Sequence, residues 1–162
     1  MLGRETLGPG AKAGEVRALG VGIVPEDRYR EAMLMSRSLR DNFLLGLQRR
    51  APFAARGARS GQIDFGALDT AVARALDEYD VRPRDPRAIA GRLSGGNQQK
   101  LVIARELERK PGLFSAAQPS RGVDVGAIEL IHGRSCEGRD GGAGVLLVSS
   151  ELDEILTLSY RI

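Results

Sequence analysis

The second half of the chain alternates strand-like and helix-like segments, and this order limits the folds available to it. Two apolar runs, Leu113 to Gln118 and Gly144 to Ser149, have the composition of strands, and each is followed by a segment with helical spacing of apolar residues. An earlier run, Gly20 to Val24, ends at Pro25 and also predicts a strand. Strands that alternate with helices usually pair in parallel and are covered by those helices. We therefore predict an α/β fold with a parallel sheet.

The first half of the chain is predicted to be mainly helical. A short helix is expected from Leu39 to Leu47, and Asp64 is expected to cap an amphipathic helix. One face of that second helix carries Leu68, Val72, Ala75, Leu76 and Tyr79. The Gly-rich residues 1–13 predict disorder or a loop, and residues 49–62 predict a mobile loop. The helix that carries Val125, Ile128 and Ile131 is expected to lose regularity in the glycine-rich run Gly133 to Gly144.

The stretch from Leu93 to Lys100 joins a polar, glycine-containing turn directly to a helix. Ser94 is a good N-cap, since its hydroxyl can accept a hydrogen bond from a backbone N–H one turn later. Gly95 and Gly96 lack a Cβ, so another backbone or a phosphate can approach closely. The first N–H groups of such a helix have no internal partner and point toward any anion in front of them. An ordinary Ser-capped helix after a loop is the alternative interpretation.

Composition narrows the function classes. The 162 residues are enough for one domain, and aromatic residues make up only 4%, which argues against base stacking on nucleic acid. The single Cys136 excludes an internal disulfide framework, and no apolar run is long enough to span a bilayer. The single His132 lacks ligands at metal spacing, so we expect a packing or surface role and no metal site.

Four segments resemble motifs of ABC-type ATPases, and they occur in the same order as in that family. Leu93 to Lys100 resembles the signature motif in its NQQK variant, and Gly22 to Arg28 resembles the VPEDR segment, with Glu26 at the Q-loop position. Pro119 to Ala127 resembles the run that contains the D-loop, with Asp124 as its aspartate. Val148 to Glu154 resembles the switch segment. The resemblance covers residues 17 to 162.

The resemblance implies the second (C-terminal) ATP-binding half of a ribose, galactose or nucleoside importer. It implies a partial cassette over residues 14–162, with a helical signature subdomain over about 36–110. In the family this motif serves ATP bound by the partner half, so the groups implied to contact that ATP are those of Ser94, Gly95, Gly96 and Gln98. ATP and Mg²⁺ would be held mainly by that second ATP-binding half. Membrane permease subunits would be the other partners, and the chain would lie peripherally on the cytoplasmic face of a bacterial-type plasma membrane.

The departures from the family pattern concern the chemistry. The sequence contains no G-x-x-x-x-G-K-[ST] phosphate loop, so we expect an incomplete cassette without the phosphate-loop strand. The Asp-Glu pair that ends the Walker B strand is replaced by Ala117 and Gln118, and the switch histidine by Ser150. Ala117 offers no oxygen to a metal's hydration shell, and Gln118 cannot take a proton from water. We do not expect this chain alone to hydrolyse ATP.

Two function classes remain open. In the first, the chain is an importer component with a degenerate site of its own that gives its signature motif to ATP on a partner. In the second, it is a non-catalytic remnant or regulatory fragment with no transport role. A third family branch, the ATPases of DNA repair and translation, is disfavoured by the NQQK form and the VPEDR segment. The transported solute is not readable from these motifs.

Overall fold

Three parallel strands form the sheet that the alternating pattern predicts. The computed structural model describes residues 10–54 and 62–159, and the predictions for residues 1–9 and 55–61 therefore lie outside the described residues. Strands β1 (Val21–Val24), β2 (Leu113–Ala117) and β3 (Gly144–Val148) pair in the order β1-β2-β3, and Val21 and Gly144 both pair with Leu113. The α/β class with a parallel sheet is confirmed.

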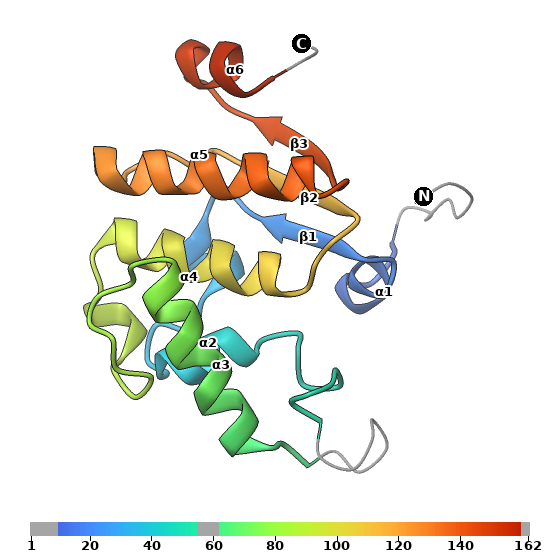
Figure 1. Ribbon diagram of the computed structural model, residues 1–162, viewed down its shortest axis with the longest axis vertical. Helices are drawn as coiled ribbons and strands as arrows, with labels where there is room; N and C mark the ends of the chain where they lie inside the picture. Colours follow the sequence, from blue (N-terminus) through green and yellow to red (C-terminus); the bar gives the residue numbers. More distant parts are fainter. Residues whose placement is uncertain (1–9, 55–61, 160–162) are drawn as a thin grey trace.

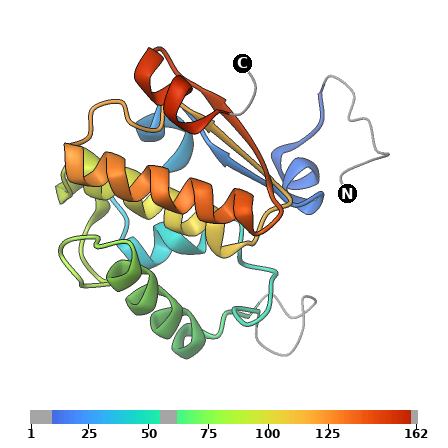
Figure 2. The same cartoon turned by 45° about the horizontal axis from the view of Figure 1, so that its top comes forward.

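Two long helices, α4 (Gly95–Glu108) and α5 (Val125–Asp140), run side by side in both ribbon views (Figures 1 and 2). Helix α4 packs on β1, α5 packs on β3, and the two helices contact each other. The short helix α1 (Ala13–Ala18) contacts β1. The short helix α6 (Leu152–Leu158) follows β3 in the chain. The sheet therefore forms one layer and the α4–α5 pair a second layer packed on it, as expected for an α/β fold.

A helical layer lies on the other side of α4. It contains a π-helical turn (Arg28–Ala32), α2 (Leu39–Leu44), α3 (Phe65–Glu78) and a 3₁₀ turn (Ala90–Arg92). The predicted Asp64 cap is present, since its carboxylate accepts a hydrogen bond from Ala67 N. The core between α2, α3 and α4 is apolar and fully buried, and includes Leu39, Phe43, Leu68, Val72, Leu76 and Ile103. Part of the expected 49–62 loop joins this core, because Phe53 is buried and packs edge-on against Phe43.

The expected loss of regularity after Gly133 is wrong, because α5 continues through Gly133 and Gly138 to Asp140. Each glycine costs about 1 kcal/mol relative to Ala in a helix interior. Tertiary contacts offset that cost: the Arg134 guanidinium donates a hydrogen bond to the Glu78 carbonyl at 2.9 Å and lies over the Tyr79 ring. Helix α5 is thus held by its neighbours rather than by its own helix propensity.

Helix α4 also carries a buried ion pair. The Arg105 side chain is 2% exposed and Glu106 is fully buried, and Arg105 Nε donates to Glu106 Oε1 at 3.0 Å. Arg105 Nη1 donates to the carbonyls of Ala32 at 2.8 Å and Asn42 at 3.1 Å. Glu106 Oε2 accepts from the backbone N–H of Ile23 at 3.3 Å. Burial lowers the pKa of the Arg105 guanidinium, and the Glu106 carboxylate opposes that shift.

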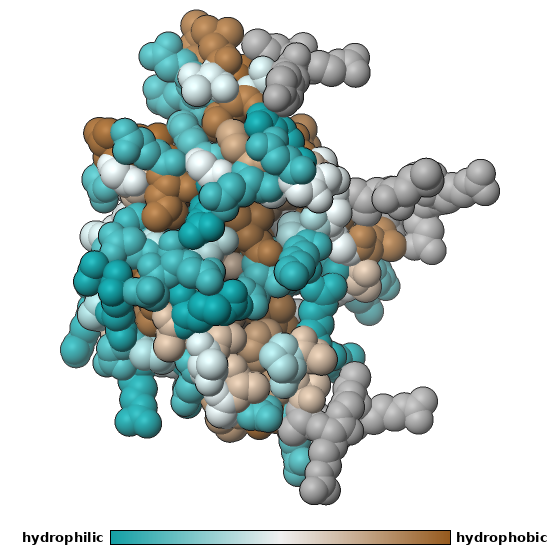
Figure 3. All heavy atoms as spheres, viewed as in Figure 1, coloured by the Kyte–Doolittle hydropathy of each residue, from teal (hydrophilic) through white to brown (hydrophobic). Residues whose placement is uncertain are grey.

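Strand β3 leaves apolar side chains at the surface. Leu146 is 54% exposed, and Val145 and Val148 are also exposed. Figure 3 shows further apolar atoms over α6 at the top of the view, where Leu152 and Leu156 are exposed. An edge strand with unpaired backbone groups and apolar side chains is a template for pairing with another chain.

Glu106→Gln is expected to lower the free energy of unfolding by about 3–5 kcal/mol, because it leaves the buried Arg105 guanidinium without its counter-charge. Glu108→Gln is the matched control on the same helix. Glu108 pairs with Arg74 at 2.6 Å, where Arg74 is half exposed, so its loss should cost about 1 kcal/mol or less. Urea denaturation measures both variants. Equal losses would contradict a structural role for the buried pair.

Leu146→Lys is expected to reduce self-association of the chain, because a charged side chain on β3 opposes edge-to-edge pairing. Size-exclusion chromatography with light scattering over a concentration series measures the change. Phe65→Lys provides the control, since Phe65 is a similarly exposed apolar residue on α3, outside the sheet. An equal effect of the two variants would show that β3 has no special part in association.

Candidate functional site

The signature turn, residues 93–100, has the cap that its sequence predicts. Ser94 is the N-cap of α4, and its Oγ accepts hydrogen bonds from Asn97 N at 3.4 Å and Asn97 Nδ2 at 3.0 Å. The first intrahelical bond runs from Gln98 N to the Ser94 carbonyl, so the N–H groups of Gly95 and Gly96 belong to the helix's unsatisfied donors. Both bonds to Ser94 use its oxygen as an acceptor, which leaves the O–H hydrogen as a donor. Ser94 is exposed.

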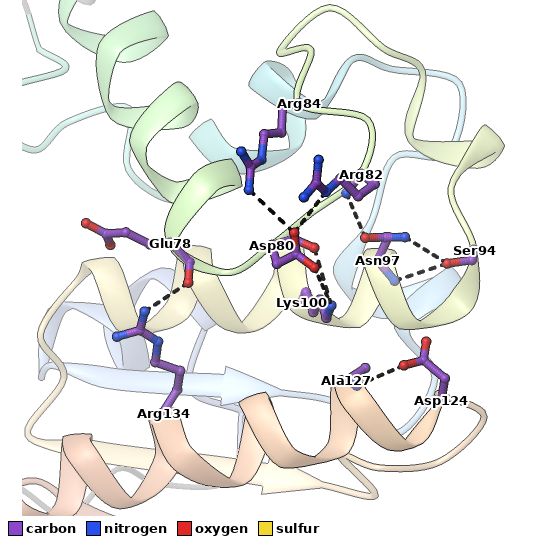
Figure 4. A network of polar contacts seen from close by, with 10 residues as sticks. All are labelled: Glu78, Asp80, Arg82, Arg84, Ser94, Asn97, Lys100, Asp124, Ala127 and Arg134. Atoms are coloured by element: carbon purple, nitrogen blue, oxygen red, sulfur yellow. Dashed lines mark hydrogen bonds and ion pairs between the residues drawn. The ribbon is translucent and has the colours of Figure 1, made fainter.

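Two side chains of the signature turn hold the connection from α3 (Figure 4). Asn97 Oδ1 accepts from the backbone N–H of Arg82 at 2.7 Å. Lys100 Nζ donates to the carbonyl of Asp80 at 3.3 Å and lies 3.7 Å from its Oδ2. Hydrogen bonding from Arg82 lowers the pKa of the Asp80 carboxyl. The polar residues of the NQQK variant thus fasten the helical layer to the start of α4.

Gln98 lies behind the turn. Its side chain is 2% exposed, and its Nε2 donates to the carbonyls of Ala90 at 3.3 Å and Leu93 at 3.2 Å. Its Oε1 accepts from Arg28 Nε at 3.5 Å. Gln98 therefore supports the turn from inside, and the contact with ATP that the resemblance implies for it does not fit this position.

The two signature glycines permit a close approach by the chain's own 119–124 loop. A Cβ on Gly95 would lie 2.8 Å from the Gly122 carbonyl oxygen, and one on Gly96 would lie 2.7 Å from Asp124 Oδ2. The neighbour of Gly95 is a backbone atom that cannot easily move, so this position requires glycine. The neighbour of Gly96 is the end of the Asp124 side chain, which would have to shift to admit a Cβ. Asp124 is also the N-cap of α5, and its Oδ1 accepts from Ala127 N at 2.9 Å (Figure 4). The signature turn and the D-loop segment thus lie against each other.

The Q-loop position joins the same cluster. Glu26 forms an ion pair with Arg121, and Arg28 Nη1 donates to the Arg121 carbonyl at 3.3 Å. A shallow pocket here is lined by Glu26, Asp27, Arg28, Tyr29, Glu31, Arg121 and Gly122. Arg28 lies within the VPEDR segment, but the sequence analysis assigned it no role. The structure brings together Glu26, Asp124 and the signature glycines.

The three altered catalytic positions lie at the carboxyl ends of β2 and β3. Ala117 is the last residue of β2, and Gln118 follows it with a φ of +50°. Gln118 Oε1 accepts from both the N–H and the Oγ of Ser150, each at 3.1 Å. Gln118 and Ser150 thus satisfy each other. These residues provide no carboxylate, and the described residues contain no group of three His, Cys, Asp or Glu side chains that could hold a metal. The donor set does not fit a metal–phosphate site.

His132 has a partner that spacing alone did not reveal. Its Nε2 lies 2.8 Å from Glu154 Oε1, which joins α5 to α6. Glu154 is 5% exposed, so it serves as a buried contact and not only as a charge at the start of a helix. The expected packing role of His132 agrees with this position.

No helix among the described residues is long and apolar enough to cross a membrane.

Curated relatives match most of this chain. It is 43% identical over 142 residues to the nucleoside import ATP-binding protein NupA of Lactococcus lactis, a match that covers 88% of this chain and 27% of the relative. It is 44% identical over 146 residues to the glucose import ATP-binding protein TsgD13 of Haloferax volcanii, covering 88% and 26%. It is 34% identical over 161 residues to a ribose import ATP-binding protein RbsA 1 of Burkholderia cenocepacia, covering 99% and 30%.

Solved structures agree on the fold. The ATP-binding cassette MJ0796, in a dimeric post-hydrolysis state bound to ADP and Pi, superposes with a TM-score of 0.67 at 23% identity. The match covers 90% of this chain and 60% of that one. A nucleotide-free ATP-binding cassette of an ABC transporter superposes with a TM-score of 0.66 at 21% identity, covering 91% and 58%.

No protein-family model matches the chain. The chain spans about 27% of the length of the nucleoside import relatives that it matches. The motifs occur in the family order, the curated matches cover most of the chain, and the cassette fold is shared. The chain is therefore homologous to a segment of the ATP-binding proteins of nucleoside and sugar importers, and it shares the fold of ABC ATP-binding cassettes.

Proposed function

We propose that the chain serves an ABC importer for nucleosides or simple sugars by presenting its signature turn to ATP held by a partner half. The observation that carries this proposal is the contrast between two sites. The signature turn keeps its cap, its unsatisfied N–H groups and an exposed hydroxyl. The chain's own catalytic positions hold Ala117, Gln118 and Ser150, and the last two are hydrogen-bonded to each other.

The chemistry of the turn suits a phosphate. ATP, with Mg²⁺ on the partner half, would supply the charged oxygens of the γ-phosphate. The Ser94 hydroxyl and the N–H groups of Gly95 and Gly96 donate hydrogen bonds at the positive end of the α4 dipole. Asp124, packed against Gly96, would be the group that reaches the opposite subunit. The chain itself performs no hydrolysis in this proposal.

The segment 26–35 is the proposed contact with membrane permease subunits. It carries two exposed large apolar side chains, Tyr29 and Leu34. Exposed apolar residues grouped in one short segment are typical of protein contacts. The chain would lie peripherally on the cytoplasmic face of the membrane, bound through the permease.

A second candidate function is a non-catalytic remnant or regulatory fragment without a transport role. The exposed apolar side chains of β3 favour it, because a finished domain usually covers such a strand. The two functions differ in one measurable respect, which is whether the signature turn affects ATP bound elsewhere.

Ser94→Arg is expected to lower the ATP hydrolysis rate of the chain assembled with a phosphate-loop-containing ATP-binding half by at least roughly 100-fold, the usual effect of losing one preorganised donor. Steady-state ATPase kinetics measure it. Asp64→Arg is the matched control, because Asp64 is the exposed N-cap of α3, a helix of the same length. The control loses about 1 kcal/mol of stability and no activity. An unchanged rate for Ser94→Arg would disprove the role in trans and favour the remnant.

The isolated chain is expected to show no saturable ATP binding by calorimetry. Its sequence contains no phosphate loop, and the described residues contain no group of three His, Cys, Asp or Glu side chains that could hold a metal. The assembled complex is the positive control. Tight ATP binding by the chain alone would contradict the proposed division of roles.

The double variant Tyr29→Ala and Leu34→Asp is expected to weaken binding of the chain to permease subunits by at least roughly tenfold, since each large apolar side chain contributes about 1.5–3 kcal/mol when buried. Phe65→Ala is the control, because Phe65 is similarly exposed on α3. Co-purification with permease in detergent measures the effect. Equal binding by the double variant and the control would move the contact elsewhere.

A further inference from the structure

The Arg28 guanidinium lies where three segments of the chain meet. Its Nε donates to Gln98 Oε1 on α4 at 3.5 Å, and its Nη1 donates to the Arg121 carbonyl at 3.3 Å. Its Nη2 would be 2.6 Å from a Cβ on Gly95. The π-helical turn, the signature turn and the 119–124 loop therefore share one side chain.

These contacts depend on geometry more than on charge. Arg28 contacts an amide oxygen, a carbonyl oxygen and the Tyr29 ring, all of them neutral groups. A planar guanidinium can donate in two directions at once, whereas a lysine ammonium is a compact charge on a flexible stem. Arginine is therefore the side chain suited to bridging Gln98 and Arg121.

A second link runs beside the first. Arg121 is bound through its side chain by Glu26 and through its carbonyl by Arg28. Two residues of one short segment thus hold a single residue of the 119–124 loop. The next residue, Gly122, has a φ of +69° and packs against Gly95. Segment 26–28 thus contacts both the loop and the signature turn.

We propose that Arg28 is a positioning residue that fixes the signature turn against the 119–124 loop. It acts through Gln98 and Arg121. This role rests on the proposed function. A partner that binds the neighbouring exposed Tyr29 and Leu34 moves Ser94 and Asp124 together, as one unit.

Amide hydrogen exchange of the full chain tests this directly and needs no partner. Arg28→Met is expected to speed exchange in peptides covering residues 94–99 and 121–127 by roughly fivefold, the factor for the loss of about one net hydrogen bond. Arg30→Met is the matched control, because the Arg30 side chain is 87% exposed and its ion pair is with Asp27 of the same turn. Unchanged exchange in both segments would overturn the proposal, as would equally faster exchange throughout the chain.

Arg28→Lys separates positioning from charge. We expect the amide hydrogens of segments 94–99 and 121–127 to exchange as fast in Arg28→Lys as in Arg28→Met. Lysine keeps the positive charge but cannot donate hydrogen bonds in two fixed directions. Rescue by lysine would overturn the positioning role. In the assembled importer, Arg28→Met is expected to lower kcat with an unchanged KM for ATP, because the substitution displaces the signature turn and leaves the partner half, which holds ATP in the proposed function, unaltered. A raised KM with an unchanged kcat would overturn the positioning role.

The two proposals fail in different ways. If Ser94→Arg leaves the ATPase rate unchanged while Arg28→Met still loosens both segments, the role in trans is wrong and the positioning role stands. If Ser94→Arg abolishes the rate while Arg28→Met leaves exchange unaltered, the role in trans stands and the positioning role is wrong.

Discussion

The buried pair of Arg105 and Glu106 is the interaction on which the arrangement of the chain depends. Arg105 binds the carbonyls of Ala32 and Asn42, and Glu106 binds the N–H of Ile23. One helix is thereby joined to the sheet, to the π-helical turn and to the helical layer through groups that are costly to leave unpaired. Apolar packing alone tolerates small slips between helices, but these directional bonds do not. The register of α4 is therefore fixed relative to everything that surrounds it.

That fixed register determines what the signature turn can do. The far end of α4 is held by the ion pair, and its first turn is held by Asn97, Lys100 and Gln98. The hydrogen-bond donors around the exposed Ser94 are already held in place, so they have little conformational freedom to lose when a ligand binds. Donors that are already oriented bind an anion without a further ordering cost. The polar residues of the motif thus contribute mostly to rigidity, its glycines pack against the 119–124 loop, and Ser94 carries the exposed hydroxyl.

Local signals in the sequence predicted the helix starts well. The caps at Asp64 and Ser94 use hydrogen bonds within one helical turn, which a short stretch of sequence contains in full. The fate of charged and polar side chains at a distance was not predictable. In the sequence, Glu106 looks like a surface carboxylate of a helix, and Gln98 looks like an exposed amide. Their partners lie 83 residues away for Glu106 and 8 residues away for Gln98, and only the structure identifies them. The prediction of where α5 ends was wrong for the same reason. Contacts with α3 stabilise the helix by more than its glycines destabilise it.

The bond between Gln118 and Ser150 limits what a carboxylate at position 118 could do. Gln118 Oε1 accepts from both the N–H and the hydroxyl of Ser150. A glutamate restored at position 118 would meet the same two donors, and hydrogen bonds to a carboxylate stabilise its charged form. It would be held tightly and would be a weak base toward water. A carboxylate at position 118 alone would therefore add little base chemistry, and Ala117 beside it would still offer no oxygen to a metal.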